Sequence, residues 1–180
     1  PEALDAYEQA AELDYDKAVV WLRMAEIYGQ MDCVKDLGRA CDEALAINPR
    51  FPWAYNDLGG SFQVEANERL ARHQDPTSAA MQAIAALQQA VRLDPEYAIG
   101  YSNIALTYSN LARHAAESGS DPREYVIKAE ENAEQAEKID KGNLLAAGSR
   151  AFAYLMQAVF EHDSGSDIEK TIDTFNRAIE

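Results

Sequence analysis

The sequence predicts an all-α protein, built as a solenoid of antiparallel helix pairs. Only 6 Pro and 9 Gly occur in 180 residues, and the composition is rich in Ala, Glu, Leu and Gln, which favour helices over strands. A helical face with an aromatic residue at each end also recurs along the chain, as WLRMAEIY at 21–28, YNDLGGSF at 55–62 and YSNIALTY at 101–108. A single helix pair cannot bury such a face, whereas a stack of pairs can.

The chain is strongly acidic, with 16 Lys and Arg against 31 Asp and Glu and a formal net charge of −15. Such a surface repels phosphate groups, so we expect neither nucleic acid nor an anionic membrane as a partner. No apolar run approaches the roughly 20 residues that a membrane span requires, and no basic and apolar leader opens the sequence. These features predict a soluble protein, and a start at Pro1 without Met suggests a piece of a longer chain.

The two cysteines, Cys33 and Cys41, are predicted to be reduced thiols, buried or half-buried. They are eight residues apart in one predicted helix, which separates them by about 12 Å along its axis. A disulfide needs Cα atoms within about 7 Å, and the spacing matches no zinc signature. Reduced thiols favour a cytoplasmic location.

The second helix of each predicted pair ends in a similar way, with ALAINP at 44–49, AVRLDP at 90–95 and AEKIDK at 136–141. Pro stops the helix in the first two cases. Together with the aromatic face, these helix ends resemble the tetratricopeptide repeat family, whose 34-residue unit has aromatic, Leu-Gly and Tyr positions on its first helix and Ala and Pro positions on its second. The resemblance covers nearly the whole chain and implies a right-handed superhelix of helix pairs.

On this resemblance the chain is a single array, 1–180, of complete and partial units. The expected divisions are the second helix of a partial unit at 1–17, a unit at 18–51, units with insertions at 52–97 and 98–143, and an incomplete unit at 144–180.

Compared with the unit at 18–51, the two middle units each carry 12 additional residues between their helices. The step from the last aromatic of the first helix to the first small residue of the second is 21 residues for Phe62 to Ala83 and again for Tyr108 to Ala129. Both inserted stretches end in Asp-Pro, at 75–76 and 121–122, which is a helix-start signal because the carboxylate caps free N–H groups. The residues before it keep a helical composition. We therefore expect the first helix of these units to be lengthened by about two turns, which raises a wall along one edge of the stack.

The sequence contains none of the catalytic motifs GxSxG, HExxH, GxxxxGK[ST], GxGxxG or CxxC. His73, His114 and His162 each lie near a predicted turn with an Asp nearby, and a metal or proton-sensing cluster is one interpretation. We favour the other, that they are histidines at helix ends, where positive charge suits the helix dipole. No enzyme activity, cofactor or metal is therefore expected.

Proteins of the family bind extended peptides or partner helices along the concave surface formed by their first helices, so the resemblance implies a peptide-binding site there. We take the most informative positions on that surface as the candidate site: Arg23, Glu26, Trp53, Asn56, Asp57, Ile99, Asn103, Leu106 and Phe152. The same register also places the following residues on this face: Val19, Leu22, Gly29, Gln30, Gly60, Gln63, Val64, Ser102, Ser109, Asn110, Leu145, Gly148, Ser149, Leu155 and Met156. Side-chain amides can hold a peptide backbone, and the apolar residues can receive its side chains. The alternative is that these residues line an unoccupied or self-packed surface.

Two further functions stay open beside an interaction scaffold for a protein or peptide. One is a regulatory or oligomerising segment of a multidomain signalling enzyme, such as a bacterial Ser/Thr protein kinase. Its incomplete end units would expose apolar faces and promote self-association. The other is an enzyme built on helix pairs, which would need a polar cluster in a closed pocket that the sequence does not indicate.

Overall fold

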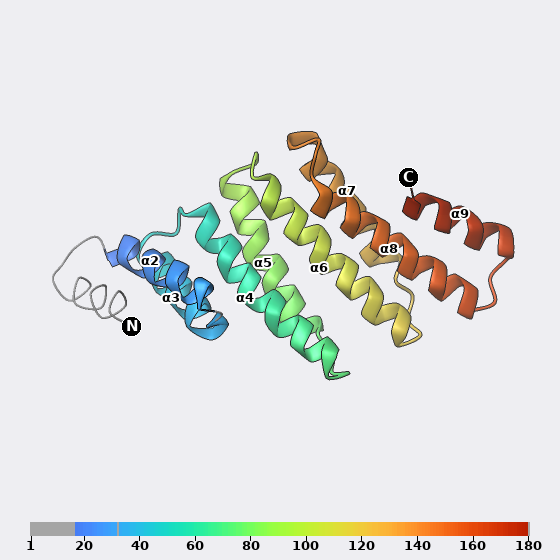
Figure 1. The fold of residues 1–180 in the computed structure, drawn as a ribbon, viewed down its shortest axis with the longest axis horizontal. Helices are drawn as coiled ribbons and strands as arrows, with labels where there is room; N and C mark the ends of the chain where they lie inside the picture. Colours follow the sequence, from blue (N-terminus) through green and yellow to red (C-terminus); the bar gives the residue numbers. More distant parts are fainter. Residues whose placement is uncertain (1–16, 32, 180) are drawn as a thin grey trace.

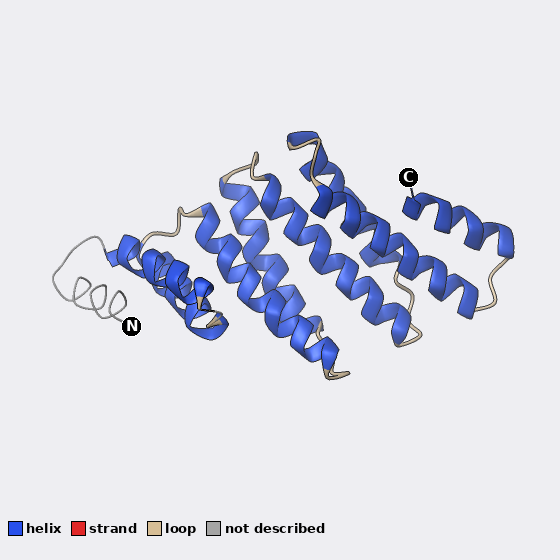
Figure 2. Ribbon diagram, viewed as in Figure 1, coloured by secondary structure: helices blue, strands red, loops and turns tan. Residues whose placement is uncertain are grey.

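The computed structural model describes residues 17–31 and 33–179. The described residues form helices without any strand (Figure 2). In chain order these are α2 (Lys17–Gln30), α3 (Val34–Ile47), α4 (Pro52–Ala71), α5 (Thr77–Leu93), α6 (Ala98–Glu117), α7 (Arg123–Ile139), α8 (Leu144–Asp163) and α9 (Ile168–Ile179). The predicted all-α fold is confirmed. The partial unit expected at 1–17 lies, apart from Lys17, outside the described residues.

The helices form antiparallel pairs that follow one another along the long axis of the molecule (Figure 1). Each pair packs internally, and its second helix packs on the first helix of the next pair. One further contact breaks this regularity, because α6 also packs extensively on α8, whereas α4 barely touches α6. None of the described helices is both long enough and apolar enough to cross a membrane.

Small residues bring the two helices of a pair close together. Gly59 of α4 faces α5 so closely that an added Cβ would lie 2.7 Å from Cγ of Leu87 and 3.2 Å from the carbonyl oxygen of Ala83. Farther along, Ala105 of α6 and Ala133 of α7 are both fully buried in one cluster. Such contacts leave no room for larger side chains, because protein interiors are close-packed.

The helices of the middle units are longer than those of the first complete pair. The first helix has 14 residues in α2 and 20 in α4, α6 and α8. The second helix has 14 residues in α3 and 17 in α5 and α7. The predicted lengthening of the first helix is therefore confirmed, but the additional residues also lengthen the second helix by about one turn. The reason is that each Asp-Pro starts the second helix early, at Thr77 for α5 and at Arg123 for α7.

The Asp-Pro turns cap the second helices as expected. The Oδ1 atom of Asp75 accepts the backbone N–H of Thr77 at 2.8 Å, and that of Asp121 accepts the N–H of Arg123 at 3.0 Å. Hydrogen bonds from these same residues lower the pKa of both aspartates. Pro76 has helical dihedral angles, with φ −85° and ψ −9°, so it begins the helix without a lost N–H bond.

A left-handed residue ends each lengthened first helix. It is His73 (φ 55°) after α4, Gly119 (φ 72°) after α6 and Gly165 (φ 71°) after α8, and these positions are 46 residues apart. A left-handed residue at this position commonly ends a helix, and Gly adopts it most easily. His73 is thus the turn residue of its unit, and the turn SGSD at 118–121 recurs unchanged at 164–167.

The two adjacent glycines of α4 provide a test of the close contact. We expect Gly60→Ala to raise the free energy of unfolding by about 0.5–1 kcal/mol, because an added Cβ meets nothing within 4 Å. Gly59→Ala should lower it, since overpacking against Leu87 costs about 1–3 kcal/mol. Urea unfolding followed by circular dichroism measures both values. An equal gain in the two variants would contradict the contact.

Candidate functional site

A groove opens on the side of the stack formed by the first helices. It encloses about 380 Å³ between α2, the start of α3, α4 and α6. Four residues of the candidate site line it, Asn56 and Asp57 from α4 and Asn103 and Leu106 from α6. The structure therefore brings together four of the six candidate residues that lie on the two middle units.

Side-chain amides connect the two walls of this groove. The Nδ2 group of Asn103 donates to Oδ1 of Asn56 at 2.9 Å, and Nδ2 of Asn110 donates to Oδ1 of Asn67 at 3.2 Å. Between them, Nε2 of Gln63 donates to the carbonyl oxygen of Asn103 at 2.9 Å. Because α4 and α6 have little other contact, these amides hold the two helices at a fixed separation.

The groove closes beyond α6 because the side chains there are smaller. The 46-residue repeat places Ser102 and Ser109 of α6 where α4 carries Asn56 and Gln63. Both serines are buried, and each Oγ donates back to a carbonyl of its own helix, at 2.9 Å for Ser102 and 2.8 Å for Ser109. A serine bonded in this way occupies little space, so α8 can pack directly on α6.

The other five residues of the candidate site do not line the groove. Arg23 and Glu26 form an exposed ion pair on α2, with 2.8 Å between Nη1 and Oε2. Trp53 is 44% exposed and packs against Phe51 with 5.4 Å between ring centroids. The remaining two also lie outside the groove. Ile99 at the start of α6 is 55% exposed, and Phe152 is half-buried on α8. The candidate residues occupy equivalent positions in the repeats, but they do not form one continuous surface.

The structure adds four residues to the groove that the candidate surface lacked: Val34, Leu37, Ser61 and Asn67. Val34 and Leu37 belong to a second helix, α3, whose first turn reaches the groove because α2 is short. Asn67 lies on the lengthened part of α4. Continuing the spacing of Gly60 and Gln63 by one more turn would have identified it.

Among the described residues, Asp57 is the only charged one that lines the groove. Burial raises the pKa of its carboxyl group, the hydrogen bond from Asn56 lowers it, and the charge of Glu26 raises it again. The groove therefore contains a partly desolvated carboxylate, and its described lining residues include no cation that could neutralise it.

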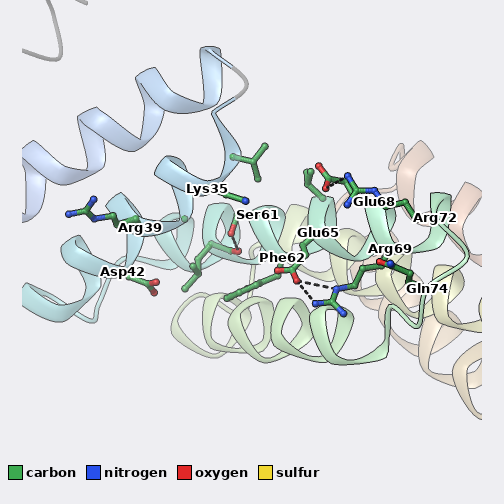
Figure 3. A pocket seen from close by; sticks show the side chains of 14 residues that line it. Lys35, Arg39, Asp42, Ser61, Phe62, Glu65, Glu68, Arg69, Arg72 and Gln74 are labelled. Atoms are coloured by element: carbon green, nitrogen blue, oxygen red, sulfur yellow. Dashed lines mark hydrogen bonds and ion pairs between the residues drawn. The ribbon is translucent and has the colours of Figure 1, made fainter.

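A larger pocket of about 630 Å³ adjoins the groove between α3 and the second half of α4 (Figure 3). We call it the ledge, because α4 extends past the shorter α2 and α3 at this place. From α3 it is lined by Val34, Lys35, Gly38, Arg39 and Asp42, and from α4 and its turn by residues between Leu58 and Gln74. Val34, Ser61 and Val64 line both the ledge and the groove.

Two of the histidines each contact one aspartate, and neither cysteine is fully exposed. His114 contacts Asp75 of the neighbouring unit, with 3.6 Å between Nε2 and Oδ1, and His162 contacts the adjacent Asp163 at 3.0 Å. In the described part of the chain no three His, Cys, Asp or Glu residues gather where they could hold a metal ion. Cys33 is half-buried and Cys41 is buried, as predicted. Burial raises the pKa of the Cys41 thiol to about 12, so it stays protonated at neutral pH.

Stacked antiparallel helix pairs, with small residues between the helices and aromatics between the pairs, define the tetratricopeptide repeat fold.

Solved structures share this fold along nearly the whole chain. Two crystal structures of MamA align with 98% of this chain, with TM-scores of 0.69 and 0.70 and sequence identities of 20% and 19%. The alignments cover 84% and 79% of the MamA chains. A thermophilic TPR protein of Thermus thermophilus aligns with 98% of this chain and 87% of its own, with a TM-score of 0.61 and 18% identity. No protein-family model and no curated protein matches the sequence. The resemblance noted in the sequence is confirmed at the level of the fold.

We expect Asp57→Asn to stabilise the protein at neutral pH. Below the ordinary pKa of 3.8, Asp57 is protonated in both the folded and the unfolded state and costs nothing. As the pH rises from 3.8 to the raised folded-state pKa, Asp57 loses its proton in the unfolded state before it does so in the folded state. The carboxylate therefore lowers the free energy of unfolding over this interval. The gain from Asn should therefore appear as the pH rises from acid to neutral.

Urea unfolding at several pH values measures this gain, and Asp173→Asn on the exposed part of α9 is the control. A gain at neutral pH that persists unchanged in acid would rule out desolvation of Asp57 as its cause.

Proposed function

We propose that this protein is a non-enzymatic interaction scaffold that binds an extended segment of a protein partner in the groove. The observation that carries this proposal is the row of side-chain amides between α4 and α6, which are paired with one another yet keep hydrogen-bonding groups for a ligand.

The remaining capacity of these amides follows from their chemistry. An Asn side chain has two N–H donors and an oxygen with two lone pairs. Asn103 uses one N–H on Asn56, and Asn110 uses one N–H on Asn67. Each therefore retains one N–H and its oxygen for another partner. An extended peptide presents an N–H and a C=O on every residue, so it matches a row of such groups.

Apolar side chains beside the amides would receive side chains of the bound segment. Leu106 is half-buried at the α6 wall, and Val64 is 39% exposed at the α4 wall. A peptide residue that covers them removes apolar surface from water. Its neighbours in an extended chain point to the opposite side.

The charge of the groove limits the partner. In the part of the chain that the structure describes, its lining contains Asp57 and neither Lys nor Arg, and the chain carries a net charge of −15. A neutral or mildly basic segment fits this environment, whereas an acidic segment would meet repulsion without a compensating ion pair.

The alternative is a self-packed surface, in which the amides only hold α4 and α6 at a fixed separation. The two roles make different predictions for Asn103. A purely structural amide affects stability and leaves ligand affinity unchanged, whereas a binding amide affects the affinity of the folded protein.

We expect Asn103→Ala to weaken binding of a groove peptide by about 1–3 kcal/mol, because a buried backbone group of the peptide loses its partner. The peptide would be selected from a displayed random library on the immobilised protein and measured by isothermal titration calorimetry. Asn132→Ala is the matched control, since the Asn132 amide donates to the Lys128 carbonyl of its own helix, α7, at 2.8 Å. Equal affinity in Asn103→Ala and the control would place the ligand outside the groove.

An oligomerising segment of a signalling enzyme would instead use the end helices. Ile172 on α9 is 53% exposed, which makes it the natural probe of that alternative. For a scaffold that acts through its groove, light scattering should give the monomer mass of 19.9 kDa at every concentration. A mass that rises with concentration in the wild type but not in Ile172→Glu would favour the oligomerising segment.

A further inference from the structure

The ledge exists because neighbouring helix pairs differ in length. In the middle of the stack, Ala80 in the first turn of α5 and Leu111 of α6 belong to one core cluster, so the lengthened part of α6 is covered by the preceding pair. The corresponding part of α4 has only α3 before it, and α3 begins at Val34 without that additional turn.

Residue types change to suit the uncovered surface. Leu111 and Ala115 of α6 are 1% and 5% exposed, and 46 residues earlier α4 carries Glu65 and Arg69. The side chains of this Glu and Arg are 48% and 41% exposed and paired at 2.8 Å. The ledge is therefore a solvent-facing surface of the fold, because charged side chains at these positions could not be buried under another repeat without a large desolvation cost.

The ledge combines an apolar floor with a basic rim. Leu58 and Phe62 of α4 form the floor, and Leu58 is only 8% exposed. Lys35 and Arg39 lie one helical turn apart on α3, and among the described residues neither is in an ion pair (Figure 3). Together they can contact carboxylates on either side of a residue that rests on the floor.

The local charge contrasts with that of the whole chain. The ledge is lined by four basic residues and three acidic ones, a difference of 4 − 3 = +1, whereas the chain has 16 basic and 31 acidic residues. Two of the acidic residues are Glu65 and Glu68 of α4, which pair with Arg69 of the same helix and with Arg72 directly after it. Exposed pairs of this kind are weak, so both arginines can exchange partners with an incoming carboxylate.

We propose that the ledge is a second binding surface, which takes an acidic segment of a protein partner. In this arrangement carboxylates pair with Lys35 and Arg39, and an apolar side chain between them covers Leu58 and Phe62. This surface differs from the groove in the chemistry of its ligand, because the described residues that line the groove include no cation. Occupation of one surface does not require occupation of the other.

The probe for this surface is a dye-labelled peptide of about ten residues, with Leu-Phe between two pairs of Glu, long enough to cross the ledge in an extended conformation. Two further peptides replace every Glu by Gln or the Leu-Phe by Ser-Ser. Fluorescence anisotropy with the full chain should show tightest binding for the Glu peptide, weakened about tenfold or more by either replacement. Equal binding of the Gln peptide, or no binding of the Glu peptide, would overturn the proposal.

The variant K35E/R39E locates the binding. We expect it to weaken the Glu peptide about tenfold or more, because attraction becomes repulsion at both rim positions. The matched control is R92E/K138E, which has the same net charge and changes two exposed cations on α5 and α7. Equal losses in the two double variants would mean that general charge, and not the ledge, attracts the peptide. Circular dichroism checks that both variants keep their helix content.

Asn103→Ala separates this result from that of the groove. Binding of the Glu peptide that is lost in Asn103→Ala and kept in K35E/R39E would place it in the groove and overturn the ledge proposal alone. Conversely, a groove peptide unaffected by Asn103→Ala would remove the groove proposal and leave the ledge result standing.

Discussion

The close approach of paired helices is the constraint on which the rest of this structure depends. At Gly59 the α4 backbone lies against Leu87 and Ala83 of α5, and fully buried alanines such as Ala105 and Ala133 mark the same kind of contact between α6 and α7. Side chains this small leave little freedom in the distance between two helices. Since each pair is thereby rigid, its stacking on the next pair fixes where the side chains of every first helix lie.

Two properties of the helices, side-chain size and length, then decide where the groove and the ledge form. The first is side-chain size. Asn56 and Gln63 of α4 hold this helix away from α6. The equivalent residues of α6 are the smaller Ser102 and Ser109, and there α8 packs closely on α6. Helix length is the second, since 14 residues in α3 against 20 in α4 leave part of α4 uncovered. Neither property changes the fold.

The fold could be predicted from the sequence because its signals are local and repeated. Aromatics at Trp21 and Tyr28, small residues at fixed spacing and Asp-Pro starts each act within one helix or one turn. The site could be predicted only in part. Asn103 and Leu106 line the groove, whereas Phe152 does not, because the contact of α6 with α8 depends on how two serines bond within their own helix. The ledge depends on a difference in helix length between neighbouring units. A search for what the repeats have in common does not reveal such a difference.

The groove and the ledge adjoin, but their charges differ, so the two proposed binding surfaces would prefer different ligands. Among the described residues, the groove is lined by a single carboxylate, Asp57, and the ledge has an excess of one basic residue, so most of the acidic excess lies elsewhere on the molecule. Val34, Ser61 and Val64 belong to both surfaces, and a chain that leaves the groove at this border enters the ledge directly. For a partner with a neutral stretch followed by an acidic one, binding of the first stretch holds the second at a high effective concentration next to the ledge. As proposed, the two surfaces together would therefore select the order of residues in a partner, which neither would do alone.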